Sequence, residues 1–308
     1  MRIIYMGTPE FAVAPLQALA EAGYEIAAVV TQPDRPRSRG RLLPTPVKAA
    51  AEALGLPVLT PEKVNREADA LAALKPDLLV VVAYGQLLSE RLLALAPLGA
   101  VNIHGSLLPA YRGAAPINAA VINGETESGV TIMYLDKGMD SGDMILQDKV
   151  AIPDNMTAGE LYDELCRRGT ALLLQALPLI AAGTAPRTPQ DHSRATYAPM
   201  LKKEDELIDW GQEARRVHDR IRGMNPFPGA YTLREGKRLK LWASRLECLP
   251  TEGAAPGTVV AVGRAGLWVA CADQALLLTE VQPEGKSRMD GGAYVRGYQV
   301  QKGLTLGR

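Results

Sequence analysis

The stretch "RIIYMGTPEFAVAPLQALAEAGYEIAAVVT", residues 2–31, decides the fold. Residues 2–6 form an apolar run that stops at Gly7, which is typical of a short buried strand. Residues 11–23 carry apolar side chains at helical spacing and end at a glycine, and residues 25–31 are a second apolar run. A strand, a helix and a second strand in this order predict parallel strands joined by a crossover helix.

The same alternation continues to the middle of the chain. The segments expected to continue it are helices at 45–55, 66–75, 89–96 and about 157–182, and strands at 56–60, 77–83 and 99–105. Residues 129–136 alternate more regularly and predict a later strand that could run antiparallel. Apolar strands between helices predict a mostly parallel sheet covered on both faces, which is a Rossmann-like α/β domain.

The second half has a different pattern. Residues 188–210 are polar and irregular, a short helix is expected at 213–224, and short strands ended by Gly, Pro or charged residues follow. Regularly spaced short strands favour a small β-barrel of the OB type. We therefore expect an α/β domain at 1–187, a linker at 188–206 and a smaller C-terminal barrel domain at 207–308.

The first strand–helix turn argues against a dinucleotide cofactor. Its sequence is "GTPEFA", residues 7–12, and it lacks the second and third glycines of the GxGxxG pattern. Glu10 also places negative charge near the start of the helix, where a pyrophosphate would bind. Ligands of such sheets still bind at the carboxyl ends of the strands, which here include residues 83–88 and the segment after residue 101.

Composition and cysteine usage indicate an ordinary globular protein. Hydrophobic residues make up 47% and charged residues 22% of the 308-residue chain, enough to bury a sizeable core. Cys166, Cys248 and Cys271 are scattered, so we expect no structural zinc and no other metal. The N-terminus resembles a strand rather than a signal peptide, and the apolar runs are too short or too interrupted to span a membrane. These features predict a cytoplasmic location.

A net charge of zero hides an asymmetry along the chain. Residues 206–308 contain 15 Lys or Arg and 11 Asp or Glu, whereas residues 1–205 contain 19 Lys or Arg and 23 Asp or Glu. Residues 33–48 hold five basic residues and one acidic residue. A charged loop is most often only a solvated surface, but a polyanion that contacts both basic regions would explain the same distribution.

The segment "NIHGSLLPAYRGAAP", residues 102–116, concentrates polar and turn-forming residues directly after a strand. Asn102 and His104 are two positions apart, so on a strand they share one face. An amide can stabilise an oxyanion, and an imidazole can donate or transfer a proton near neutral pH. A downstream glycine-rich loop supplies the carboxylates Asp136, Asp140 and Asp143. A buried structural histidine is the alternative that spacing alone leaves open.

No covalent acyl-enzyme is indicated, because the sequence has neither a GxSxG elbow nor a cysteine beside a histidine. An Asn, a His and an Asp without a nucleophile suit direct acyl transfer between two bound substrates.

The motifs "NIHGSLLPAYRGAAPI" (102–117) and "GVTIMYLDKGMDSGDM" (129–144) resemble those of the folate-dependent formyltransferases. The resemblance covers the whole chain and implies a formyl donor, 10-formyltetrahydrofolate, and no metal. It implies catalytic roles for Asn102, His104 and Asp140. The residues that it implies for folate binding are Ser106, Leu107, Leu108, Pro109, Ala83, Tyr84 and Gly85.

Four further segments, residues 31–48, 112–117, 197–210 and 225–232, resemble the branch of this family that formylates methionyl initiator tRNA. The resemblance implies that the acceptor stem of this tRNA is a partner, which would account for the charge asymmetry. The residues implied for tRNA binding are Arg35, Arg37, Arg39, Arg41, Lys237, Arg238 and Lys240. We expect a monomer that does not bind membranes.

Two alternatives remain open. One is a formyltransferase that acts on a sugar-nucleotide or ribonucleotide amine, and the other is a non-enzymatic RNA-binding protein on the same scaffold.

Overall fold

The computed structural model describes residues 1–36 and 42–307. Contacts group the chain into two compact units that interleave along the sequence. The first unit contains Met1–Gly113, Ser128–Val150 and Tyr162–Ala198, and the second contains Ala114–Glu127, Ala151–Leu161 and Pro199–Arg308. Two short segments of the first half thus belong with the C-terminal third. The domain boundaries expected from the sequence stay a prediction.

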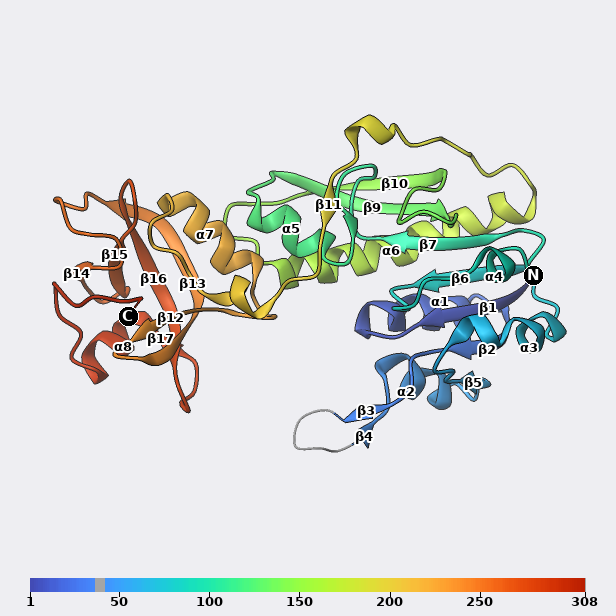
Figure 1. Cartoon of the computed structure of the whole chain (residues 1–308), viewed down its shortest axis with the longest axis horizontal. Coiled ribbons are helices and arrows are strands. Elements are labelled where there is room, and N and C mark those ends of the chain that lie inside the picture. The colour runs from blue at the N-terminus through green and yellow to red at the C-terminus, as the bar shows by residue number, and fades with distance from the viewer. Residues whose placement is uncertain (37–41, 308) are drawn as a thin grey trace. The chain divides into compact units, whose positions relative to one another are not determined.

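The first unit is built on a seven-stranded sheet with the order β10-β9-β7-β6-β1-β2-β5 (Figure 1). The strands are β1 (Arg2–Gly7), β2 (Glu25–Val30), β5 (Val58–Leu59), β6 (Leu78–Val82), β7 (Ala100–His104), β9 (Glu127–Tyr134) and β10 (Met144–Ala151). The pairs from β7 to β5 are parallel, whereas β7 and β9 are antiparallel. This confirms the mostly parallel Rossmann-like sheet, and the strand order reverses between β1 and β6.

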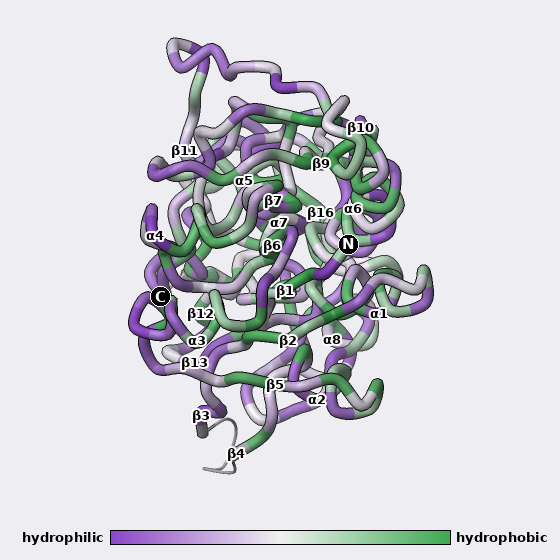
Figure 2. The backbone as a smooth tube through the Cα atoms, turned by 90° about the vertical axis from the view of Figure 1, so that its right-hand side faces the viewer, coloured by the Kyte–Doolittle hydropathy of each residue, from purple (hydrophilic) through white to green (hydrophobic). Residues whose placement is uncertain are grey.

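Helices pack on both faces of this sheet. They are α1 (Val13–Glu21), α2 (Pro46–Ala53), α3 (Ala68–Ala73), α4 (Glu90–Leu93) and α6 (Ala158–Ala181). On one face, Leu79 and Val81 of β6 share a core with Leu71 of α3 and Leu92 of α4. On the other face, Gly169 of α6 lies close enough to Ile103 of β7 that a Cβ would sit 2.8 Å from its side chain. The strands of this sheet are rich in hydrophobic residues, as Figure 2 shows for β2.

Several elements differ from the expected ones. Residues 11–23 begin with a 3-10 turn, η1 (Glu10–Ala12), before α1, and the helix expected at 66–75 divides into η3 (Val64–Arg66) and α3. The expected linker contains β11 (Tyr197–Ala198), which pairs with β8 (Arg112–Gly113). The sequence patterns also missed α5 (Pro116–Ile122) and the strand β10.

The basic segment at residues 33–48 contains two short strands that pair with each other as a small hairpin. Its strands β3 (Arg35–Pro36) and β4 (Leu42–Leu43) are antiparallel. Arg35 is exposed, whereas Arg37, Arg39 and Arg41 lie outside the described residues.

The second unit carries an antiparallel sheet with the order β12-β13-β16-β15-β14, and β17 pairs with β16. Its elements are α7 (Ala214–Gly223), β12 (Ala230–Arg234), β13 (Lys237–Leu249), β14 (Val259–Val262), β15 (Leu267–Ala270), β16 (Ala275–Pro283), β17 (Met289–Asp290) and α8 (Gly291–Gly297). Trp210, Val217 of α7 and Leu239 of β13 belong to its buried core. The antiparallel C-terminal sheet was expected, and its closure into a barrel stays a prediction.

Among the residues that the structure describes, no helix combines the length and the apolar character needed to cross a lipid bilayer.

Candidate active site

The carboxyl ends of β1 and β6 lie at the point where the strand order reverses, which is the usual ligand position in such sheets. The backbone after β6 is fixed there by side chains from two other strand ends. Thr8 Oγ1 donates to the Tyr84 carbonyl at 2.8 Å, and Gln32 Nε2 donates to the same oxygen at 3.2 Å. Ala83 and Gly85 have φ values of 48° and 91°. A left-handed alanine is uncommon, so this turn is held in an unusual shape by its surroundings.

Tyr84 contributes its backbone to this edge, because its side chain is buried in the core beneath α3 and α4. Burial raises the pKa of the Tyr84 hydroxyl to about 12. Three residues further on, the side chain of Leu87 is 79% exposed. The segment therefore offers a fixed backbone turn followed by an exposed apolar side chain.

Asn102 and His104 lie at the end of β7 and are both buried. His104 Nε2 lies 2.9 Å from the carbonyl oxygen of Tyr111. A carbonyl can only accept a hydrogen bond, so Nε2 carries a proton, and Nδ1 faces Asp140 Oδ2 at 3.6 Å. Within residues 1–36 and 42–307, the side-chain amide of Asn102 has no hydrogen-bond partner.

The three aspartates of the glycine-rich loop differ in their contacts. Asp140 Oδ2 accepts from the Gly113 amide at 2.8 Å and faces His104. Asp136 Oδ1 accepts from Gly138 N and Ser141 Oγ within its own loop. Asp143 lies 3.9 Å from Arg187. Of these three carboxylates, the structure therefore brings Asp140 to the histidine.

The turn at residues 106–109 is pinned to the neighbouring strands. Thr131 Oγ1 of β9 donates to the Ser106 carbonyl at 2.7 Å, and the Leu108 amide donates to Thr131 Oγ1 at 3.3 Å. Gln147 Nε2 of β10 donates to the Leu108 carbonyl at 3.0 Å. Leu107 packs against Gly129, where a Cβ would lie 2.4 Å from the leucine side chain. The turn is thus positioned by polar side chains that local sequence patterns do not reveal.

Arg112 and Gln190 also reach this loop region, and sequence reasoning missed them as site residues. Arg112 donates to Gln190 Oε1 from Nε at 3.1 Å and from Nη2 at 2.6 Å. Gln190 Nε2 in turn donates to the carbonyls of Asp140 at 2.9 Å and Gly142 at 2.8 Å. Gln190 lies in the polar segment expected to be a linker, and its only sequence signal was that polar character.

The chain matches two known protein-family models. The family described as "Formyl transferase" matches residues 1–177, and the family described as "Formyl transferase, C-terminal domain" matches residues 200–299. The chain belongs to the formyl transferase family.

Two relatives within this family are named methionyl-tRNA formyltransferase. The protein from Moorella thermoacetica is 54% identical over 310 residues, which cover 100% of this chain and 99% of the relative. The protein from Bacillus subtilis is 47% identical over 310 residues, which cover 99% of this chain and 98% of the relative.

Solved structures share the fold at lower identity. HypX from Aquifex aeolicus in complex with tetrahydrofolic acid has a TM-score of 0.66 and 19% identity over 96% of this chain and 47% of that one. An N-formyltransferase from Helicobacter canadensis has a TM-score of 0.68 and 18% identity over 91% of this chain and 98% of that one. At this identity the likeness supports the formyl transferase fold alone.

Three of the basic residues expected to bind tRNA lie on one strand of the C-terminal sheet of this formyl transferase. Lys237 and Arg238 are exposed and Lys240 is half-buried on β13. The Arg238 guanidinium lies 4.5 Å from the centre of the Tyr231 ring, and Lys240 Nζ lies 5.3 Å from that of Trp242. Arg238, Lys240 and Trp242 alternate with buried Leu239 and Leu241, so they share the opposite face of the strand.

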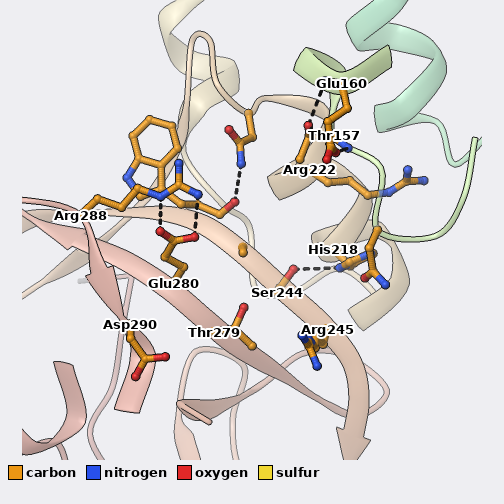
Figure 3. Close-up of a pocket in the computed structure, with 14 residues that line it drawn as sticks. Thr157, Glu160, His218, Arg222, Ser244, Arg245, Thr279, Glu280, Arg288 and Asp290 are labelled. Atoms are coloured by element: carbon orange, nitrogen blue, oxygen red, sulfur yellow. Dashed lines mark hydrogen bonds and ion pairs between the residues drawn. The ribbon is translucent and has the colours of Figure 1, made fainter. Parts of the chain in front are cut away.

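A polar cavity of about 560 Å³ lies within the second unit and contains none of the predicted catalytic residues (Figure 3). His218 Nδ1 lies 2.9 Å from Ser244 Oγ, and His218 Nε2 donates to the Asp154 carbonyl at 2.8 Å. Burial lowers the pKa of His218 below its ordinary value. Its two neutral partners fit a structural role for this histidine.

No group of three or more His, Cys, Asp or Glu side chains that could hold a metal ion occurs in the described ranges 1–36 and 42–307.

Proposed function

We propose that this formyl transferase transfers the formyl group of 10-formyltetrahydrofolate to the free α-amino group of methionyl initiator tRNA. The observation that carries the proposal is the grouping of Asn102, His104 and Asp140 beside the pinned turn at residues 106–109. The acceptor is inferred from relatives named methionyl-tRNA formyltransferase that are 47% and 54% identical over nearly the whole chain.

The three side chains have distinct tasks in a direct transfer. Esterification of methionine to tRNA removes its carboxylate and makes its amine less basic, so more of it is free to attack the formyl carbon. Attack places negative charge on the formyl oxygen in a tetrahedral intermediate. The Asn102 side-chain amide and the positive charge of a protonated His104 ring stabilise that charge. Asp140 supports the positive imidazole and assists the departure of the amine proton. The intermediate then collapses with cleavage of the bond between the formyl carbon and N10, and N10 gains a proton so that tetrahydrofolate leaves.

The donor would bind along two neighbouring loops. Ser106, Leu107, Leu108 and Pro109 are held by Thr131 and Gln147, and Ala83, Tyr84 and Gly85 are held by Thr8 and Gln32. Both loops follow strands of the first unit, β7 and β6, that pair directly in parallel. Backbone amides and carbonyls of such fixed turns suit the donor and acceptor edge of a pterin ring.

The acceptor stem of the tRNA would be bound by Arg35, Arg37, Arg39 and Arg41 of the basic segment and by Lys237, Arg238 and Lys240 of β13. The tRNA is a polyanion, and exposed cations on both regions provide the charge complementarity that its phosphates require.

A formyl-transfer assay with three acceptors tests the proposal. Charged initiator tRNA, charged elongator Met-tRNA and an amino sugar nucleotide are compared at equal concentration with 10-formyltetrahydrofolate. We expect the highest kcat/KM with initiator tRNA. Preference for the amino sugar nucleotide would replace the tRNA acceptor by a small one, and tRNA binding without transfer to any acceptor would identify a non-enzymatic RNA-binding protein.

A further inference from the structure

A buried side-chain link lies behind the loop that carries Asp140. Arg112 is 4% exposed and Gln190 is 5% exposed. The arginine donates twice to Gln190 Oε1, and the Gln190 amide nitrogen donates to the carbonyls of Asp140 and Gly142. Both ends of one glutamine amide are therefore used to join the arginine to the backbone of the loop.

Stability alone does not explain this arginine. Among the residues that the structure describes, no carboxylate lies within ion-pair distance of the Arg112 guanidinium, and its other side-chain partner is His192 Nδ1 at 3.0 Å. A buried cation without a counter-ion is destabilising relative to an apolar side chain of similar size. The position therefore has a use other than filling the core.

The link ends at a backbone that needs support. Asp140 has a φ of 48°, a left-handed conformation that a residue other than glycine adopts only at a cost. The strand β8 holds Asp140 at two points, because Arg112 reaches its carbonyl through Gln190 and the Gly113 amide donates to its carboxylate at 2.8 Å. Pairing of β8 with β11 fixes the strand itself.

We propose that Arg112 and Gln190 are positioning residues that keep the Asp140 carboxylate directed at His104 Nδ1. Neither side chain is required to touch the reacting atoms. The guanidinium orients the glutamine amide, and the oriented amide holds the carbonyls of Asp140 and Gly142. The inference rests on the proposed function, since it assumes that Asp140 supports His104.

The substitution Gln190→Glu separates positioning from charge neutralisation. A glutamate keeps an oxygen for Arg112 and supplies the missing counter-charge, but it replaces the two N–H donors by an oxygen that faces two carbonyls. We expect kcat to fall about 10- to 100-fold, the effect of a small misplacement of a catalytic group. KM for both substrates should stay unchanged, the melting temperature should not fall, and amide exchange should accelerate across residues 136–143.

Two further variants complete the test. Arg112→Met and Gln190→Leu should each lower kcat, and the double variant should be no worse than either single one, because both act through one link. Gln175→Leu, on the exposed surface of α6, is the matched control and should leave kcat unchanged.

A wild-type kcat in the Gln190→Glu variant would overturn the positioning role. It would show that Gln190 serves only as a hydrogen-bond acceptor for the buried Arg112 guanidinium. Strict additivity of the two single effects would also overturn it. An Asp140→Asn variant with wild-type kcat would instead overturn the role given to Asp140 in the proposed function, whatever the Gln190 variants show.

Discussion

Asp140 differs from the other two aspartates of its loop in conformation as well as in contacts. Its φ is 48°, and Tyr111, whose carbonyl accepts from His104, has a φ of 58°. Left-handed conformations at residues other than glycine persist only where surrounding contacts impose them. Two of them flank the histidine, so the fold holds this small region in a shape that the backbone alone would avoid.

Asp140→Asn should lower kcat by about two orders of magnitude, because the amide keeps the shape of the side chain but loses the charge that supports a protonated imidazole. Single-turnover formylation measures the chemical step directly. Asp136→Asn is the matched control, since the Asp136 carboxylate bonds within its own loop. A larger loss in the control would mean that Asp136 is the catalytic carboxylate.

The sequence allowed only part of this site to be predicted. A period of two on β7 places Asn102 and His104 on one face, which is a local rule. All three aspartates lie in one glycine-rich loop, and its sequence does not indicate which of them faces the histidine. Asp140 was therefore chosen from the family resemblance. Gln190 was not predicted, since its partner Arg112 is 78 residues away in the chain and no local pattern records such a contact.

At the scale of elements, the two-residue strand β8 has a larger role than its length indicates. It pairs with β11, and the amide of its second residue, Gly113, donates to Asp140. Gly113 has a φ of 114°, and a Cβ there would lie 2.8 Å from the Ala198 carbonyl oxygen. Glycine is required at this position for both its conformation and its close approach to β11.

Gly113→Ala should therefore destabilise the protein by about 1–3 kcal/mol, the usual cost of an imposed backbone conformation, and should lower kcat. Urea unfolding and single-turnover kinetics measure the two effects. The matched control is Gly55→Ala, where φ is 66° and nothing lies within 4 Å of the added Cβ. The control should lose stability without losing kcat, and an equal loss of kcat in both variants would contradict the role of β8.

The helix α7 contains the buried His218, whose pKa is lowered chiefly by burial. A histidine with a lowered pKa binds fewer protons in the folded state than in the unfolded state, where its pKa is about 6.5. Its neutral form contributes stability above that pH, and the contribution is lost as the pH falls toward the lower folded value.

The urea midpoint should accordingly decrease as the pH falls below about 6.5, the unfolded pKa. His218→Gln should flatten this decrease, because the glutamine amide does not titrate. Unfolding curves recorded in steps of half a pH unit, with wild type beside the variant, check the prediction. Identical pH dependence in the two proteins would show that other groups cause the loss.

At the scale of the whole molecule, charge is distributed unevenly: the C-terminal third has a net positive charge and the rest of the chain has a net negative charge. Lys237 and Arg238 at the start of β13 and Arg35 of the hairpin β3–β4 are the exposed cations of the described surface that the proposed tRNA partner would contact.

Reversing two charges of β13, Lys237→Glu with Lys240→Glu, should raise KM for charged initiator tRNA and leave KM for the folate donor unchanged. The slope of log KM against log salt concentration should fall by about one for each phosphate that the variant no longer neutralises. Arg264→Glu with Arg296→Glu is the matched control, because both arginines are exposed in the same unit but belong to other elements, Arg264 to the turn between β14 and β15 and Arg296 to α8. An equal effect of both pairs would reduce the role of β13 to nonspecific attraction.

The predicted fold was most accurate where the sequence signal is local. β6 is an uninterrupted apolar run and β1 is apolar after Arg2, and both lie where they were expected. β7, which ends with Asn102 and His104, also lies where it was expected. β10 was missed because its burial alternates irregularly, and α5 because seven residues after a turn give fewer than two helical periods to recognise. The interleaving of the two units depends on contacts between distant segments, such as Gly223 against Ile122, and no local pattern contains that information.

That interleaving also affects the order in which the protein can be completed on the ribosome. Residues 114–127 are synthesised early, but Ile122 packs on a core whose other members lie between residues 208 and 306. At about 5–20 residues per second, the ribosome needs about 5 to 20 seconds to pass from the end of this segment to the end of α7. During that interval the nascent chain carries α5 without its packing partners. The first half of the chain therefore cannot reach its complete native packing when it emerges from the ribosome.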